Sequence, residues 1–129
     1  MELQKIDIQG LRDIYAVSVV QKEFKKAVNE PWKDEEPWNR YQKRLMQDLA
    51  VLDDQKECAI NLQYFERLSE AKGLYSIRHP ETPKNVRIIY TITDNSEVIL
   101  LTAFLEKNVS DYKRAIKVAL MRLKWLESN

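Results

Sequence analysis

The sequence is poor in the residues from which many active sites are built. Its 129 residues include one cysteine, one histidine and two glycines, namely Cys58, His79, Gly10 and Gly73. A single cysteine excludes an intrachain disulfide and a zinc site made of cysteines. A single histidine excludes acid–base catalysis by a histidine pair, and two distant glycines cannot form a phosphate-cradling loop. We expect His79, which precedes Pro80, to face solvent in a loop. A histidine–nucleophile pair could use only this residue.

Long apolar runs are also absent. One of the longest, residues 98–105, is far shorter than the roughly 20 apolar residues of a membrane-spanning helix. Residues 1–9 mix acidic and basic side chains among the apolar ones, which does not fit a signal peptide. Together with the single cysteine, these features predict a cytoplasmic protein that contacts no membrane. The length and the 44% hydrophobic and 32% charged fractions are typical of one globular domain, residues 1–129.

Charge is nearly balanced but unevenly distributed. The formal net charge is +1; residues 1–69 carry 11 basic and 13 acidic residues, and residues 70–129 carry 10 basic and 7 acidic residues. The positive excess in the second part favours an anionic partner there, with a solvated basic face as the alternative. Carboxylates are plentiful, but those at 34–36 form a solvated run without metal-ligand spacing. We predict neither a metal ion nor another cofactor.

The first part of the chain predicts a strand, a helical turn and a loop. The apolar run at residues 15–20 indicates the strand, and residues 24–28 indicate a short helical turn. The following segment, 29–38, contains two prolines and predicts a loop. We expect its Trp32 and Trp38 to pack on the body of the domain.

Helical periodicity begins at residue 39. Four residues recur at spacings of four, four and three, which is one stripe of an amphipathic helix: Tyr41, Leu45, Leu49 and Leu52. A second set repeats the pattern at Cys58, Leu62, Phe65 and Leu68. This second stripe predicts another helix, which ends at Gly73 as its C-cap.

Three strands are expected in the second half. Apolar runs rich in β-branched and aromatic residues occupy residues 73–78, 85–92 and 98–107. The turn-forming residues at 93–96 indicate that the last two strands pair antiparallel.

A final helix follows the strands. Its apolar stripe consists of Tyr112, Ile116, Ala119, Leu123 and Leu126. Ser110 or Asp111 is expected to be its N-cap. The order of elements predicts an α+β fold, in which the N-terminal, central and C-terminal helices pack on one face of a small antiparallel sheet of about four strands.

Basic residues interrupt the expected strands. Alternation puts Arg87 on the face opposite Ile88, away from the core, so removing its side chain should cost little stability. Arg78 could reach the same patch from a neighbouring strand. Two guanidiniums there suit a phosphodiester, whose transition state gains negative charge. Lys107 lies just past the last strand, and Tyr112 opens the final helix.

Each candidate also has a purely structural interpretation. An arginine in a strand can serve as a solubiliser at the edge of a sheet. Tyr112 begins an apolar stripe and therefore also suits the core.

Several short motifs occur here in a recognisable order. They are Gly-Leu-Tyr-Ser-Ile-Arg at 73–78, Val-Arg-Ile-Ile-Tyr at 86–90, Phe-Leu-Glu-Lys at 104–107, and a helix containing Ala115 and Ala119. In this order and spacing, residues 65–126 resemble the RelE/HigB/ParE superfamily of toxins from bacterial and phage type II toxin–antitoxin systems.

The resemblance implies a RelE-like fold and an activity. RelE- and HigB-like toxins cleave mRNA on the ribosome without a metal, and the ribose 2′-hydroxyl attacks the adjacent phosphate. By resemblance, Arg78 and Arg87 would neutralise the scissile phosphate, Lys107 would assist proton transfer or charge stabilisation, and Tyr112 would orient or stack on a base. The implied partners are the ribosome, mRNA and an antitoxin of the helix-turn-helix type. Any oligomer would form through the antitoxin or as a weak dimer.

Two positions depart from the superfamily pattern. Glu106 replaces the first lysine of a Lys-Lys pair, and Ser76 stands where some members have a basic residue. The ParE branch has the same fold but poisons DNA gyrase, so fold alone does not choose the target. The alternative function is therefore a non-catalytic interaction protein, either a gyrase inhibitor or an inactive phage-encoded relative.

Overall fold

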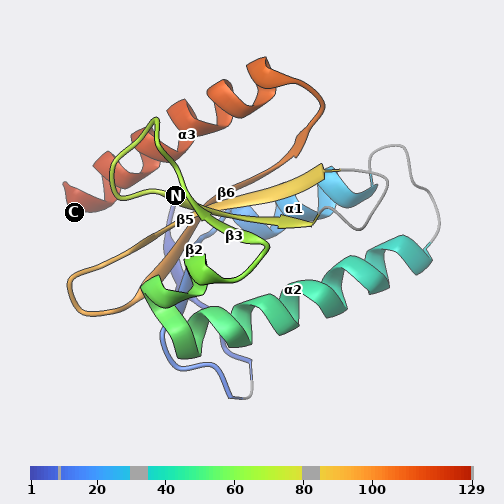
Figure 1. The fold of residues 1–129 in the computed structure, drawn as a ribbon, viewed down its shortest axis with the longest axis horizontal. Coiled ribbons are helices and arrows are strands. Elements are labelled where there is room, and N and C mark those ends of the chain that lie inside the picture. Colours follow the sequence, from blue (N-terminus) through green and yellow to red (C-terminus); the bar gives the residue numbers. More distant parts are fainter. Residues whose placement is uncertain (9, 30–34, 80–84, 129) are drawn as a thin grey trace.

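The computed structural model describes residues 1–8, 10–29, 35–79 and 85–128 (Figure 1). The strands are β1 (Leu3–Lys5), β2 (Ile14–Val17), β3 (Phe65–Arg67), β4 (Tyr75–His79), β5 (Asn85–Ile92) and β6 (Val98–Glu106). The helices are α1 (Val20–Asn29), α2 (Glu35–Gln55), the 3-10 helix η1 (Lys56–Asn61) and α3 (Val109–Glu127). These elements form an α+β fold, as the sequence predicts.

The described strands form one mixed sheet in the order β1-β2-β6-β5-β4-β3. β2 runs parallel to β6, and the other neighbouring pairs are antiparallel. The predicted number of about four strands is therefore too low, and the predicted antiparallel direction holds for every neighbouring pair except β2 and β6. β1 and β3 have three residues each, which is too short to show a period in the sequence. The parallel pairing depends on the crossover that joins β2 to β6, which local sequence does not encode.

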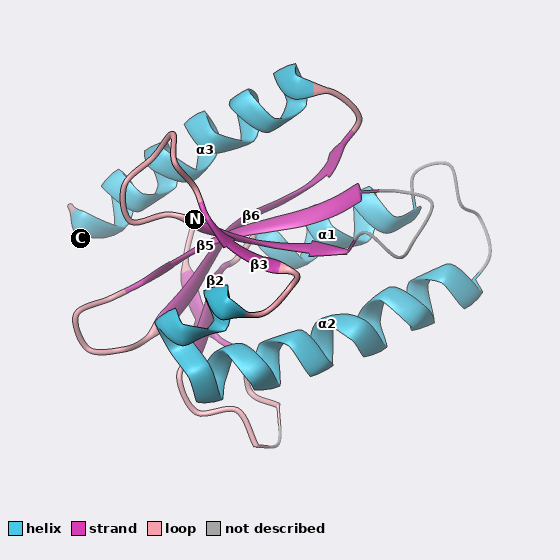
Figure 2. Ribbon diagram, in the orientation of Figure 1, coloured by secondary structure: helices cyan, strands magenta, loops and turns pink. Residues whose placement is uncertain are grey.

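Helices cover both faces of the sheet, contrary to the prediction that they share one face. Figures 1 and 2 show α3 on one side of the strands and α2 on the other. The contacts agree with this arrangement. Arg87 of β5 lies against Tyr112 of α3, whereas His79 of β4 lies against Phe24 of α1 and Tyr41 of α2. Both faces of the central strands are therefore covered, and most of the residues of β5 are buried.

The predicted second helix, up to Gly73, is wrong. The chain forms η1 and then β3, which pairs antiparallel with β4. Leu62 is exposed although its place in the stripe predicted burial, while Phe65 is buried at the start of β3. Gly73 has φ +84° and lies in the turn before β4, where a left-handed backbone favours glycine. Pairing with the edge of β4 therefore overrides the helical spacing.

The other elements lie close to their predicted positions. The stripe of α2 is buried at Tyr41, Leu49 and Leu52, and β5 and β6 form the predicted antiparallel hairpin. α3 begins at Val109, but its N-cap is Asn108, whose side chain accepts a hydrogen bond from the backbone N–H of Asp111. Neither predicted cap residue is the N-cap.

The first part of the chain differs at its boundaries. β2 ends at Val17, and α1 begins at Val20 and contains the predicted helical turn. The second half of the expected loop is helical, because α2 begins at Glu35. The expected packing of Trp32 and Trp38 lies outside the described residues. Among the described helices, none is both long and apolar enough to cross a membrane.

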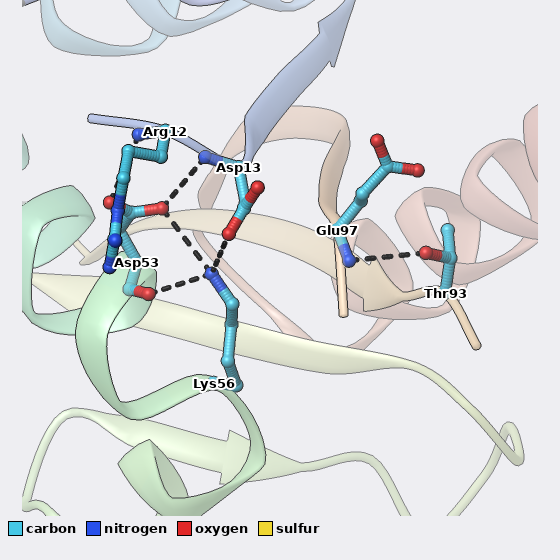
Figure 3. Close-up of polar contacts among 6 residues, drawn as sticks. All are labelled: Arg12, Asp13, Asp53, Lys56, Thr93 and Glu97. Carbon is cyan, nitrogen blue, oxygen red and sulfur yellow. Dashed lines mark hydrogen bonds and ion pairs between the residues drawn. The ribbon is translucent and has the colours of Figure 1, made fainter. Parts of the chain in front are cut away.

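A polar cluster connects the end of α2 to the start of β2 (Figure 3). The Asp53 carboxylate accepts hydrogen bonds from the backbone N–H groups of Arg12 and Asp13, and Lys56 Nζ lies 3.3 Å from Asp53 Oδ1 and 3.0 Å from Asp13 Oδ2. Burial raises the pKa of Asp53, but the hydrogen bonds from Asp13, Arg12 and Lys56 lower it below its ordinary value. In the same view, the backbone N–H of Glu97 donates to Thr93 Oγ1 in the turn before β6.

Candidate functional site

Two of the predicted site residues lie side by side in the sheet. Arg78 of β4 and Arg87 of β5 are register partners in an antiparallel pair, so their side chains leave the same face. This is the face that α3 covers. The sequence-based prediction that the two arginines share a patch is correct in its placement, but their surroundings differ.

Arg87 is enclosed by carboxylates. Only 8% of the residue is exposed. Its Nη1 lies 2.5 Å from Glu66 Oε1 and its Nε forms an ion pair with the Glu106 carboxylate. Glu106 also accepts a hydrogen bond from Asn85 Nδ2 at 2.9 Å, and Ser76 Oγ lies 3.4 Å from Arg87 Nη1. The prediction that Arg87 projects away from packed surroundings is therefore wrong, because α3 and two glutamates close over that face.

Tyr112 of α3 joins this cluster. The guanidinium carbon of Arg87 lies 5.1 Å from the centroid of the Tyr112 ring, within the range of a cation–π contact. Phe104, the register partner of Arg87 on β6, also contacts Tyr112, with 6.4 Å between the two ring centroids. Burial and the charge of Glu70 raise the pKa of Tyr112 to about 12, although Arg87 lowers it in part. Its phenol therefore stays protonated at neutral pH and can donate a hydrogen bond.

Arg78 has a different environment from its register partner. It is half-buried, its backbone N–H donates to Tyr64 O at 3.0 Å, and its Nε is buried without a hydrogen-bond partner. Among the residues that the structure describes, none pairs with its guanidinium. No described carboxylate balances the charge of Arg78, whereas Glu66 and Glu106 balance the charge of its neighbour Arg87.

Lys107 directly follows Glu106 at the end of β6. Its backbone N–H donates to Asp111 Oδ2 at 3.0 Å at the start of α3. The residue lines a hollow of about 400 Å³ beside β6, between α1 and α3, together with Lys26 and Arg114. Of the described residues that line this hollow, none is Arg78, Arg87 or Tyr112. Phe104, whose ring lies beside that of Tyr112, also lines the hollow, so Lys107 borders a space next to the cluster.

His79 is not the solvent-facing loop residue that the sequence suggests. It is the last residue of β4, 3% exposed, with its Nδ1 3.4 Å from Asp48 Oδ2. Because it follows Arg78 directly, its side chain leaves the opposite face of the sheet. Burial, and to a lesser extent the charge of Arg44, lowers its pKa to about 4. His79 is therefore a neutral residue of the core beneath α1 and α2.

The site residue that sequence reasoning missed is Glu66. It lies on β3 directly opposite Ser76 of β4, and its side chain is 45% exposed. Assigning residues 58–68 to a helix hid its relation to the sheet. The sequence offered no periodic signal for this strand, because burial only decreases along its three residues, from Phe65 to Arg67. Among the described residues, no group of three or more His, Cys, Asp or Glu side chains is arranged to hold a metal ion.

Comparison with known proteins identifies a family. Residues 37–124 match the family described as phage derived protein Gp49-like (DUF891). The match covers more than half of the chain, and the protein belongs to this family. The matched segment contains most of α2, strands β3 to β6 and most of α3, and hence the whole cluster around Arg87. No curated protein matches the chain.

Proposed function

We propose that this protein is the toxin of a type II toxin–antitoxin pair and that it cleaves mRNA on the ribosome. The observation that carries the proposal is the grouping of Arg78, Arg87 and Tyr112 on one face of the sheet, inside the segment that matches the phage-derived family. The expected reaction is attack of a ribose 2′-hydroxyl on the adjacent phosphate, with a cyclic phosphate and a free 5′-hydroxyl as products.

In this proposal the residues have distinct roles. Arg78, whose charge no described residue balances, contacts the scissile phosphate and stabilises the negative charge that grows there. Arg87 is a positioning residue, because its guanidinium is held by Glu66 and Glu106 and by the ring of Tyr112. Tyr112 orients a base. Lys107 assists proton transfer or charge stabilisation from the end of β6.

A second candidate function follows from one observation. The charge of Arg87 is already balanced by Glu66 and Glu106, so this face is less basic than two strand arginines suggest. This favours a non-catalytic protein on the same fold, which binds and inhibits a partner such as DNA gyrase.

Expression of the chain alone in bacteria tests the proposed function. Growth should stop, and mapping of RNA 5′ ends should show new ends with a 5′-hydroxyl within translated regions. The same ends should appear when purified protein acts on mRNA bound to ribosomes, with or without chelator, and far more slowly on naked RNA. Co-expression with a small helix-turn-helix protein encoded by the neighbouring gene should restore growth.

Three outcomes would contradict the proposal. Normal growth with abundant folded protein would remove the toxin function altogether. Growth arrest with intact mRNA and inhibited DNA supercoiling would support the gyrase-directed alternative. Products with a 5′-phosphate would indicate a different cleavage mechanism.

A further inference from the structure

The two carboxylate oxygens of Glu66 differ in their hydrogen bonds. Its Oε1 accepts hydrogen bonds from Arg87 Nη1 at 2.5 Å and from Ser76 Oγ at 3.3 Å. Among the described residues, none donates a hydrogen bond to Oε2. The side chain is 45% exposed, compared with 21% for Glu106, the other carboxylate that holds Arg87. Glu66 is thus an oriented carboxylate on a partly exposed side chain.

Attack by a ribose 2′-hydroxyl needs a group that accepts its proton, and most candidates on this protein are unsuitable. Tyr112 is protonated at neutral pH and cannot act as a base. His79 is buried on the opposite face of the sheet, and Lys107 lines the hollow beside β6. Glu106 is also held by Arg87 and Asn85, and its side chain is only 21% exposed, so a substrate reaches it less readily than Glu66. Of the described residues in the cluster, Glu66 is the best-placed proton acceptor.

We propose that Glu66 is the general base of the cleavage reaction, an inference that rests on the proposed function. Its carboxylate takes the proton of the 2′-hydroxyl, and the oxygen forms a bond to the adjacent phosphorus. The bond between phosphorus and the 5′-oxygen breaks, and that oxygen takes a proton from water. The products are a 2′,3′-cyclic phosphate and a 5′-hydroxyl. Glu66 then returns its proton to water, and no atom changes its oxidation state, so no further reactant is needed.

The sheet places Glu66 close to Arg78, the residue proposed to bind the phosphate. Glu66 stands opposite Ser76, and Arg78 lies two residues further along the same strand, so all three side chains leave one face. Diagonal neighbours across two strands are within reach of long side chains. A phosphate held by Arg78 would therefore bring the neighbouring ribose toward Glu66. Arg87 fixes the orientation of the base through Oε1 and leaves Oε2 for the substrate.

The decisive experiment compares three variants on ribosome-bound mRNA. Glu66→Gln keeps the size of the side chain and an oxygen for Arg87, but it cannot accept the proton. We expect single-turnover cleavage to fall at least about 100-fold, the lower end of general-base effects, with ribosome binding unchanged. Glu70→Gln is the matched control, because it removes a negative charge from an exposed neighbour that also affects Tyr112. It should cleave like the wild type.

The pH dependence separates a base from a merely structural carboxylate. The wild-type rate should fall in acid as Glu66 is protonated, and the residual rate of Glu66→Gln should not show this fall. Glu66→Asp keeps the carboxylate and should retain partial activity with the acid limb. It also provides the test if Glu66→Gln does not fold, as judged by circular dichroism.

Two results would overturn the inference, and they are distinguishable. If the wild type cleaves and folded Glu66→Gln cleaves equally with the same pH profile, Glu66 is not the base and the proposed function stands. If the wild type produces no cleavage, both proposals fail.

Discussion

Arg78 and Arg87 stand directly opposite each other on β4 and β5, yet only Arg87 is enclosed by carboxylates. Two like charges at a register pair repel each other. Glu66 and Glu106 offset this repulsion from one side, because both ion pairs are made to Arg87. The two arginines therefore differ in role. Arg87 holds Glu66, Glu106 and Tyr112 together, and the charge of Arg78 is available to bind an anionic ligand.

Arg87→Ala should reduce the stability of the fold. Its removal leaves the partly buried Glu106 carboxylate without the cation that balances it, and a buried polar group that loses its partner costs about 1–3 kcal/mol. Urea denaturation should therefore show a lower free energy of unfolding. The sequence alone predicts a cost near zero, and a denaturation midpoint equal to that of the wild type would support that earlier expectation.

Arg78→Ala should have the opposite profile. The residue is half-buried and no described side chain pairs with it, so we expect a stability change within about 0.5 kcal/mol. Cleavage should fall about 100-fold or more, since a charge-assisted contact to the transition state is lost. Growth arrest and ribosome-bound cleavage are the measurements. Full toxicity of a folded Arg78→Ala protein would show that the phosphate is held elsewhere.

Asn108→Ala should destabilise α3. The Asn108 side chain accepts the backbone N–H of Asp111 at the first turn, and loss of an N-cap costs about 0.5–2 kcal/mol. Ser110→Ala is the control, because Ser110 was a candidate cap in the sequence but does not cap the helix. Thermal unfolding should rank the wild type and Ser110→Ala above Asn108→Ala. Equal melting temperatures for the two variants would contradict the assigned cap.

Stability should fall in mild acid because of His79. Its pKa is about 4 in the folded protein and 6.5 ordinarily, so the unfolded chain binds a proton first as the pH falls. The contribution of neutral His79 is fully present above pH 6.5 and is lost between pH 6.5 and about 4, by at most about 3 kcal/mol. Asp48 opposes the effect, since its carboxylate favours the imidazolium, but burial outweighs it.

The comparison variant for this effect is His79→Gln, which does not titrate. Denaturation midpoints measured from pH 7 to pH 4.5 should fall more steeply for the wild type than for the variant. Parallel curves would show that His79 does not carry the acid sensitivity.

Local patterns in the sequence determined the regular elements with strong periods. The eight residues of β5 and the hairpin to β6 were predictable from their alternation and from the turn at 93–96. The apolar spacing along α2 and α3 also predicted these two helices correctly. The sharing of one face by Arg78 and Arg87 also followed, because side chains alternate along paired strands whatever the rest of the fold does.

Tertiary structure decided what local patterns do not encode. β3 is a three-residue strand because β4 offers it an unpaired edge, and this pairing brings Glu66 to Arg87 from more than twenty positions away in the sequence. Packing of α3 on one face and α2 on the other buries Arg87 and His79 alike, although their neighbours in the sequence predict exposure. The charge state and the burial of a side chain depend on groups that the fold brings close in space, and these contacts arise only when the layers assemble.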